Sequence, residues 1–146
     1  MNHDLSLACE RLESGGFTCV LCKNDTVLTA TERGVQPLLQ FLHAKQDLRG
    51  FSAADRVVGK AAAYLYVLMG VSALYAKVLS KPAKDVLEYY GISVQYETLT
   101  DAIRNRTGDG YCPMEQAVLS LSDPKEALRA IERTRAVLLA ETKRTL

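Results

Sequence analysis

One short stretch, residues 105–116, holds the side chains best suited to chemistry, and it reads NRTGDGYCPMEQ. Within it, Cys112 and Pro113 have the form of a helix start, with proline at the first helical position and Glu115 at the third. Cysteine is an unusual cap, because an oxygen accepts a first-turn N–H better than sulfur does. A thiol at the positive end of a helix dipole is also placed to react as the nucleophilic thiolate. Covalent chemistry at Cys112, ligand contact and a purely structural helix start all remain open.

The loop before this helix start carries groups that suit an anion. Backbone N–H groups of a glycine-bearing loop can wrap around a negative charge, and a guanidinium can clamp it. A nucleophilic cysteine also needs a base, and Asp109 and Glu115 are the nearest carboxylates in sequence. His3 and His43 are distant, so a Cys-His pair would require tertiary contact. The predicted ligand-binding residues of the loop are Asn105, Arg106, Thr107 and Gly108.

Composition and charge exclude several classes of protein. The chain has 146 residues, of which 48% are hydrophobic and 24% charged, the proportions of an ordinary globular domain. Its net charge of +1 gives no electrostatic footprint for nucleic acid or an acidic membrane surface. The N-terminal residues lack the basic segment and apolar stretch of a signal peptide, and no apolar run reaches the length of a membrane span. These features predict a cytoplasmic protein without nucleic-acid or membrane partners.

Cysteine spacing argues against disulfides and structural zinc. The four cysteines are few and irregularly spaced for a disulfide framework. Cys19 and Cys22 form a C-x-x-C, but the surrounding FTCVLCKN is apolar and β-branched, which predicts a strand. Residues three apart on a strand point to opposite faces, so these two thiols cannot share one metal or one disulfide.

Hydrophobic periodicity and turn residues predict alternating helices and strands that position these groups. Gly15-Gly16 ends a first helix, and Asn24-Asp25 joins two strands in a hairpin. In order, the predicted elements are a helix over 5–15, strands over 17–23 and 26–31, a helix over 34–44, a helix over 52–69, a strand over 72–80, a helix over 82–90, a strand over 92–98, a short helix over 98–106, and helices beginning at 113 and 124.

The helix over 52–69 is the strongest prediction of the set. Ser52 and Asp55 fit a capping box, in which the serine oxygen accepts a first-turn N–H and the carboxylate reaches back to the cap. The apolar residues that follow form a broad stripe that would face the core. Asp55 is then either this cap or a functional acid at the helix start. Arg56 and Lys60 would lie one turn apart, so both can reach one anion or both can face solvent.

The order of elements predicts an α/β core. Two strands separated by one helix, as over 72–80 and 92–98, pair in parallel through a right-handed crossover. A capping box at Thr98 and Asp101 predicts the short helix after the second of these strands. The chain shows no linker or repeat, so we expect one domain over residues 1–146 with its C-terminal helix from about 124.

Four segments of the chain carry a family resemblance: TERGVQPLL, ADRVVGKAAA, YAKVLSKPA and NRTGDGYCPMEQAV. They look like the signature segments of a small family of uncharacterised bacterial proteins, known as a domain of unknown function. The resemblance covers nearly the whole chain and implies a cytidine deaminase-like fold, with three layers, a central mixed sheet and helices on both faces. It implies no reaction, because that family has none assigned.

The active deaminases that share this fold need zinc. They hold it with a His or Cys and a Glu at one helix start, and with P-C-x-x-C at the next. The corresponding starts here, SAADRVVGK and SKPAKDV, contain neither His nor Cys. We therefore expect no metal, no cofactor and no zinc-dependent deamination. Two helix N-termini at one end of the sheet would remain, a natural place for a small polar ligand held by Lys60 and Ser80. Otherwise Ser80 only caps its helix and Lys60 reaches solvent.

Three functional hypotheses follow. The first and favoured one is a binding domain that holds a small polar or nucleotide-like ligand between Lys60, Ser80 and the 105–115 loop. The second is a metal-free enzyme with Cys112 as nucleophile and Glu115 or Asp55 moving protons. The third is a structural role in a homodimer or higher homo-oligomer, through an aromatic surface formed by Tyr64, Tyr66, Tyr89 and Tyr90.

Overall fold

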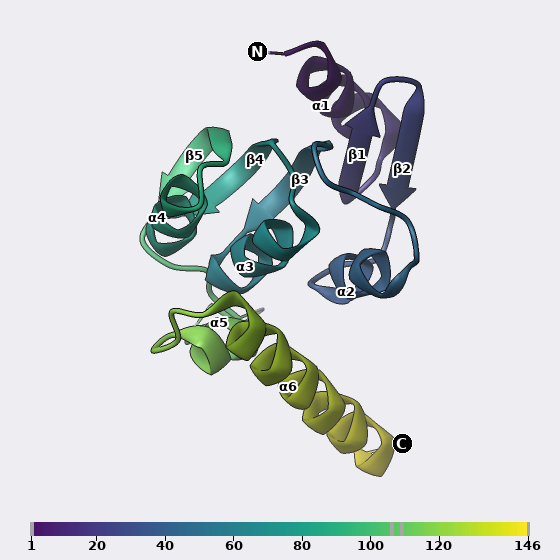
Figure 1. Cartoon of the computed structure of the whole chain (residues 1–146). Coiled ribbons are helices and arrows are strands. Elements are labelled where there is room, and N and C mark those ends of the chain that lie inside the picture. Colours follow the sequence, from purple (N-terminus) through teal and green to yellow (C-terminus); the bar gives the residue numbers. More distant parts are fainter. Residues whose placement is uncertain (1, 106, 109, 146) are drawn as a thin grey trace.

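The computed structural model describes residues 2–105, 107–108 and 110–145. Its elements alternate along the chain in the way that the hydrophobic pattern predicts for most of its length (Figure 1). They are α1 (His3–Gly15), β1 (Cys19–Lys23), β2 (Thr26–Ala30), α2 (Gln36–His43), β3 (Ser52–Val58), α3 (Lys60–Met69), β4 (Ala73–Ser80), α4 (Lys81–Tyr89), β5 (Ser93–Thr100), α5 (Pro113–Val118) and α6 (Pro124–Thr145).

The strands form one mixed, open sheet in the order β2-β1-β3-β4-β5. The β1–β2 hairpin is antiparallel, and β1 also runs antiparallel to β3. The remaining neighbours, β3–β4 and β4–β5, are parallel, as the crossover argument predicts for β4 and β5. The mixed α/β class expected from the sequence is therefore confirmed.

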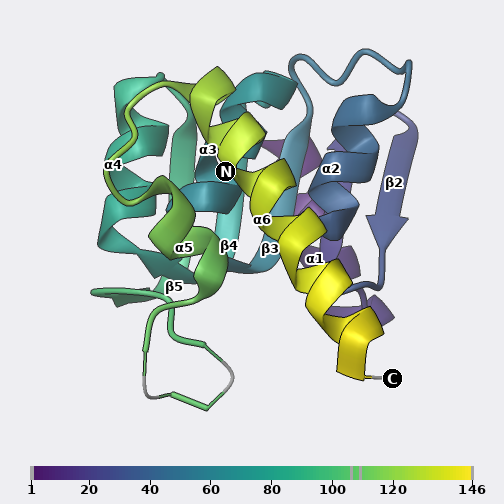
Figure 2. The same ribbon diagram turned by 90° about the horizontal axis from the view of Figure 1, so that it is seen from below.

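Helices cover both faces of the sheet (Figure 1). On one face α1 packs its buried Leu5, Ala8 and Leu12, the last two beside Val20 of β1 and Ala54 of β3. On the other face lie α2, α3 and α4, and their apolar side chains share the main core with β1, β3 and β4. From below, α5 and α6 lie over the outer side of this helix layer (Figure 2).

The helix predicted to begin at Ser52 is wrong in its first third. Residues Ser52–Val58 form β3, the central strand, and α3 begins only at Lys60. The capping box of Ser52 and Asp55 therefore does not exist. Residues 52–58 include Asp55 and Arg56 and show no strict two-residue alternation, so periodicity does not mark them as a strand. Backbone pairing with β1 on one side and β4 on the other makes residues 52–58 a strand.

The short helix predicted over 98–106 is also wrong. Strand β5 continues to Thr100 because β4 supplies partners as far as Ser80. Asp101, predicted to cap that helix, instead forms an ion pair with Lys81, with 2.8 Å between carboxylate oxygen and Nζ. Further along, Arg104 and Tyr111 form an isolated antiparallel bridge. The segment is a loop closed by this bridge.

Local sequence rules account for the other helix ends. Gly16 ends α1 in the left-handed conformation, at a φ of 69°. Ser80 caps α4 and Asp123 caps α6, each accepting the N–H of the third residue after it. Among the described residues, no helix combines the length and the apolar content needed to cross a membrane.

Candidate functional site

The N-termini of α3 and α4 lie side by side at one edge of the sheet. Val58 and Leu79 are register partners near the ends of the parallel strands β3 and β4. Each strand passes directly into its helix, through Gly59 for α3 and Ser80 for α4. The free N–H groups of two helices therefore point toward the same region, where their dipoles favour negative charge.

A carboxylate from another part of the chain occupies the α3 N-terminus. Glu115 of α5 accepts the backbone N–H of Lys60 at Oε1, at 2.6 Å, and that of Ala61 at Oε2, at 2.8 Å. Gly59, the N-cap residue, has no side chain that could satisfy these groups. Glu115 thus caps α3 from 55 residues away in the chain.

Gly59 makes this close approach possible. A Cβ atom at this position would overlap the carboxylate of Glu115. The backbone of Gly59 is extended, so glycine is needed here for space and not for its dihedral angles. The pair Gly59 and Glu115 is one structural unit, although the sequence predicted Glu115 as a base for Cys112.

The electrostatics of Glu115 combine burial with favourable contacts. Burial raises the pKa of this carboxyl group, while the N–H groups of Ala61 and Lys60 and the charge of Lys60 lower it, and the net shift is upward. The Lys60 ammonium extends along α5 and donates to the carbonyl of Leu119 at 2.9 Å. It also lies 5.8 Å from the centre of the Tyr64 ring. Lys60 therefore binds α5 at its C-terminal end as Glu115 binds α3.

Ser80 lies in the same region and is completely buried. Its hydroxyl oxygen accepts the N–H of Ala83 at 3.1 Å. This is the capping role that the sequence offered as one alternative. Ser80 and Lys60 begin neighbouring helices, so the structure does bring these two predicted ligand-binding residues to one edge of the sheet.

Cys112 is the N-cap residue of α5, and its side chain makes no capping hydrogen bond. The thiol is half-buried. The predicted base, Glu115, uses both carboxylate oxygens to accept α3 N–H groups. A Cys112–Glu115 pair would have to break this cap first.

The predicted anion loop projects from the body of the protein (Figure 2). Asn105 accepts the N–H of Gly108 at 3.1 Å and donates its own N–H to Gly110 at 2.8 Å, which makes a tight turn. Thr107 donates its hydroxyl to the Asn105 side chain at 3.1 Å. Arg106 lies outside the described residues. Asn105, Thr107 and Gly108 belong to this loop and bond to one another or to Gly110.

Asp55 belongs to a separate cluster in the middle of the sheet. It stands opposite Cys19 in the β1–β3 register. The hydroxyl of Tyr66, from α3, donates to Asp55 Oδ2 at 2.6 Å and lies 3.1 Å from the Cys19 sulfur. The other carboxylate oxygen accepts the N–H of Arg56 at 2.7 Å. Three titratable groups thus form one hydrogen-bonded chain.

The pKa values of Asp55, Tyr66 and Cys19 are all raised above their ordinary values. Burial raises the pKa of Asp55 to about 7, against the hydrogen bonds from Tyr66 and the backbone that lower it. Burial, then the charge of Asp55, hold the pKa of Cys19 well above its usual range, and the same two causes raise the pKa of Tyr66. The carboxyl group can therefore exchange a proton near neutral pH, whereas the thiol and phenol stay protonated.

The partners of Asp55 differ from those that the sequence predicts. A helix over 52–69 hides the register of Asp55 with Cys19, and Tyr66 lies in the core instead of on the predicted tyrosine surface. Arg56 was also misplaced beside Lys60: its guanidinium crosses to the α1 face, where it donates to the carbonyls of Phe17 and Leu12. A strand assignment for residues 52–58 is the signal that would have revealed these contacts.

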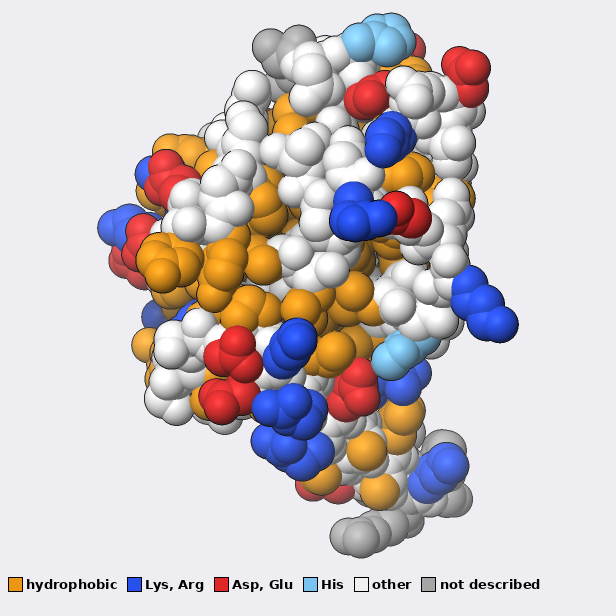
Figure 3. Space-filling view, in the orientation of Figure 1, with side chains coloured by type: hydrophobic (Ala, Val, Ile, Leu, Met, Phe, Trp, Pro, Cys, Tyr) orange, Lys and Arg blue, Asp and Glu red, His pale blue; other side chains and the backbone are white. Residues whose placement is uncertain are grey.

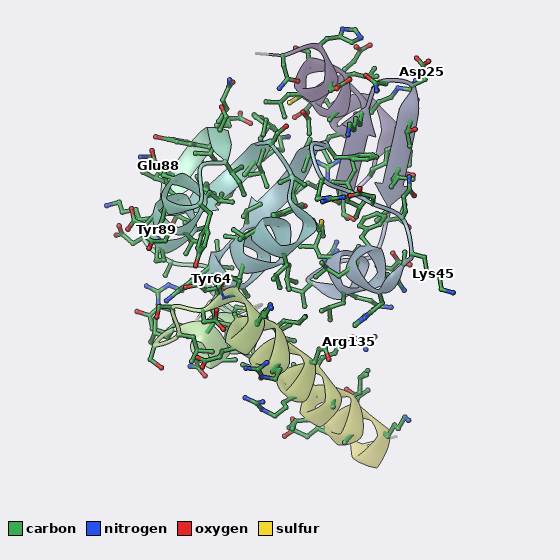
Figure 4. All side chains as sticks on the ribbon, in the orientation of Figure 1. Asp25, Lys45, Tyr64, Glu88, Tyr89 and Arg135 are labelled. Atoms are coloured by element: carbon green, nitrogen blue, oxygen red, sulfur yellow. The ribbon has the colours of Figure 1, made fainter. Side chains whose placement is uncertain are left out.

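The predicted tyrosine surface is wrong for two of its four members. Tyr66 is fully buried, and Tyr64 is buried with its hydroxyl donating to the carbonyl of Leu121 at 2.9 Å. Tyr89 is 82% exposed and points outward from α4 (Figure 4). Tyr90 packs against it edge to face, with ring centres 4.9 Å apart. Only these two remain available to a partner.

Taken together, the fold and site define a mixed α/β domain in which a remote carboxylate occupies a helix N-terminus at the ends of two parallel strands. Among the described residues, no group of three or more His, Cys, Asp or Glu is placed to hold a metal ion. The family model described as a domain of unknown function, DUF1893 (TM1506), matches residues 7–134. The chain therefore belongs to the DUF1893 family.

A solved relative has the same fold over most of its length. The crystal structure of a DUF1893 family protein, TM1506 from Thermotoga maritima, is 26% identical in sequence. The similarity covers 91% of each chain with a TM-score of 0.83. A search of curated proteins found no match.

Proposed function

We propose that this protein is a zinc-free, cytidine deaminase-like domain that binds a small organic anion at the N-terminus of α3. The strand order β2-β1-β3-β4-β5 and the two adjacent helix starts support the deaminase-like assignment. At those starts the chain has Gly59-Lys60-Ala61 and Ser80-Lys81-Pro82, none of which supplies the His or Cys of a zinc site. What these residues supply is N–H donors and positive charge, which suit an anion.

One observation carries the proposal: this site already holds a carboxylate. Two α3 N–H groups donate to the planar carboxylate of Glu115, at 2.6 and 2.8 Å. The carboxylate comes from α5, a helix of six residues that follows the projecting loop. In the proposed mechanism a ligand carboxylate or phosphate takes the place of Glu115.

Exchange would replace one buried anion by another, so the ligand would bear the same burial cost as Glu115 and gain the same N–H contacts. Because burial raises the pKa of Glu115, its charged form is less favourable in the site than in water. A departing Glu115 regains hydration, and the incoming anion inherits the two N–H groups and the nearby ammonium of Lys60. Protonation of Glu115 in acid would weaken its hydrogen bonds from the α3 N–H groups and so would also favour its departure.

The test is an amide-resolved titration by NMR. We expect phosphate or AMP to shift the backbone amide signals of Lys60 and Ala61, and adenosine, which has no charge, to leave them unchanged. Glu115→Ala opens the site and should tighten phosphate binding by at least about tenfold. Glu141→Ala, which removes an exposed carboxylate from α6, is the matched control and should match the wild-type chain.

A second variant guards against loss of folding. Glu115→Gln keeps one acceptor oxygen and the shape of the side chain, but loses the competing charge. If neither Glu115 variant responds to roughly 10 mM phosphate at these amides while both remain folded, the proposal is wrong and Glu115 is only a structural cap.

A further inference from the structure

We infer that the groove between α2 and α6 is a second binding site, for a small organic anion, separate from the α3 N-terminus. The groove has a volume of about 560 Å³, which is within the range of small-ligand sites. Charged side chains and a histidine gather at the surface over this junction, where α6 leaves the body of the protein (Figure 3). The lining residues are Gln36, Leu39, Gln40, His43, Ala44, Glu132 and Arg135.

Three of the lining side chains have polar groups without protein partners. Within residues 2–105, 107–108 and 110–143, the side chains of Gln36, Gln40 and Arg135 form no hydrogen bond and no ion pair. Gln36 and Arg135 are half-buried, and Arg135 lies at the edge of α6 that faces α2 (Figure 4). Gln40 is exposed. A partly desolvated guanidinium and two amides that line one groove are donors that suit an oxyanion.

Glu132 is the one acid among the described residues that lines the groove, and it contacts a histidine. Glu132 Oε1 lies 3.3 Å from His43 Nε2, across the groove from α6 to α2. Arg135 follows Glu132 by about one turn, but no ion pair joins them. The charge of Arg135 is therefore left for a ligand, and the His43–Glu132 contact limits one side of the groove.

The floor of the groove favours an organic ion over an inorganic one. Leu39 is 5% exposed and lies between Gln36 and Gln40 on the same helix, with Ala44 beyond them. If the carboxylate or phosphate of a ligand binds Arg135, room remains for a flat or apolar part of the same ligand against Leu39. A polar edge of that part would face the amides of Gln36 and Gln40. The ligand class is thus a small molecule that combines one oxyanion with a compact organic body.

Calorimetry with simple probes tests the site in the full chain. Benzoate and phenyl phosphate carry the two candidate oxyanions, benzamide is the neutral analogue of benzoate, and inorganic phosphate lacks the organic body. We expect one of the two organic anions to bind, with benzamide and inorganic phosphate at least about tenfold weaker. The stronger of the two identifies the oxyanion as carboxylate or phosphate.

Matched arginine variants locate the binding. Arg135→Gln should weaken binding of the organic anion by at least about tenfold. Arg133 is an exposed arginine on the same helix outside the groove, and Arg133→Gln should leave the binding affinity unchanged. Gln40→Leu, which removes one amide without touching charge, should weaken binding to a smaller extent. The groove assignment would be wrong if both arginine variants lost the same affinity for the organic anion, or if benzamide bound as tightly as benzoate.

The two proposed sites can fail independently. Glu115→Ala alters the α3 N-terminus and leaves every lining residue of the groove in place. It should therefore leave unchanged the binding of benzoate or phenyl phosphate that Arg135→Gln weakens. If Glu115→Ala instead tightens that binding, the ligand occupies the α3 site and the groove assignment is wrong.

Discussion

Asp55→Asn should remove most of the pH dependence of stability between mildly acidic and mildly alkaline solution. In the folded protein the pKa of Asp55 is about 7, above the ordinary value of 3.8. The folded state therefore binds this proton more tightly than the unfolded state does. The stability contributed by the protonated group is fully present in acid and is lost as the pH rises through about 7.

The magnitude follows from the two pKa values. For a shift from 3.8 to about 7, the free energy of unfolding falls by about 2.6 kcal/mol between roughly pH 5 and pH 8. Asp55 as a residue is only half-buried, which lowers the expectation to roughly 1–2 kcal/mol. Asparagine resembles the neutral acid: its oxygen can accept the N–H of Arg56, and its amide can donate to Tyr66. The variant should thus be the more stable chain above neutral pH.

The assay is urea unfolding of both chains at several pH values across this range. Other groups titrate in both proteins, so the difference between the two curves isolates Asp55. Asp47→Asn is the control, because Arg49 holds the pKa of the exposed Asp47 below its usual range and its titration lies well below pH 5. Parallel stability curves for wild type and Asp55→Asn would refute the reasoning.

Three further predictions concern the helix starts. Gly59→Ala should destabilise the fold by about 1–3 kcal/mol because its Cβ overlaps Glu115, and most of this loss should vanish in a Glu115→Ala background; additive losses in denaturant unfolding would contradict the contact. Ser80→Ala leaves the N–H of Ala83 without its cap and should cost about 1–2 kcal/mol, seen as a melting temperature lower by roughly 2–8 °C. Cys112→Ser supplies an oxygen cap to α5 and should stabilise by about 0.5–1 kcal/mol; a destabilised serine variant would show that the sulfur makes a contact of its own.

Local sequence signals determined most of the elements. The glycine after α1, the turn residue Asn24, Ser80 before Pro82, and Asp123 before Pro124 all act within a few residues of themselves, so the sequence alone predicts their effects. The same holds for the opposite faces of Cys19 and Cys22, which follow from the two-residue period of a strand.

Tertiary structure decided the identity of β3. Its seven residues show no strict two-residue alternation, and pairing with β1 and β4 on both sides selects the strand. With that assignment Asp55 leaves the helix start and joins Cys19 and Tyr66, which lie 36 and 11 residues away in sequence. No local pattern contains such a contact.

The candidate site divides in the same way. The sequence by itself showed that Ser80 precedes a helix start, that Glu115 lies in the first turn of its own helix, and that Cys112 is a poor cap. It began the helix of Lys60 at Ser52, whereas α3 begins at Lys60. Only the folded chain brings Glu115 onto the N–H groups of α3, because a cap from another helix depends on where α5 packs and not on neighbouring residues. Short-range hydrogen bonding and periodicity thus fixed where α4 and α6 begin, whereas long-range packing decided where α3 begins and which groups meet there.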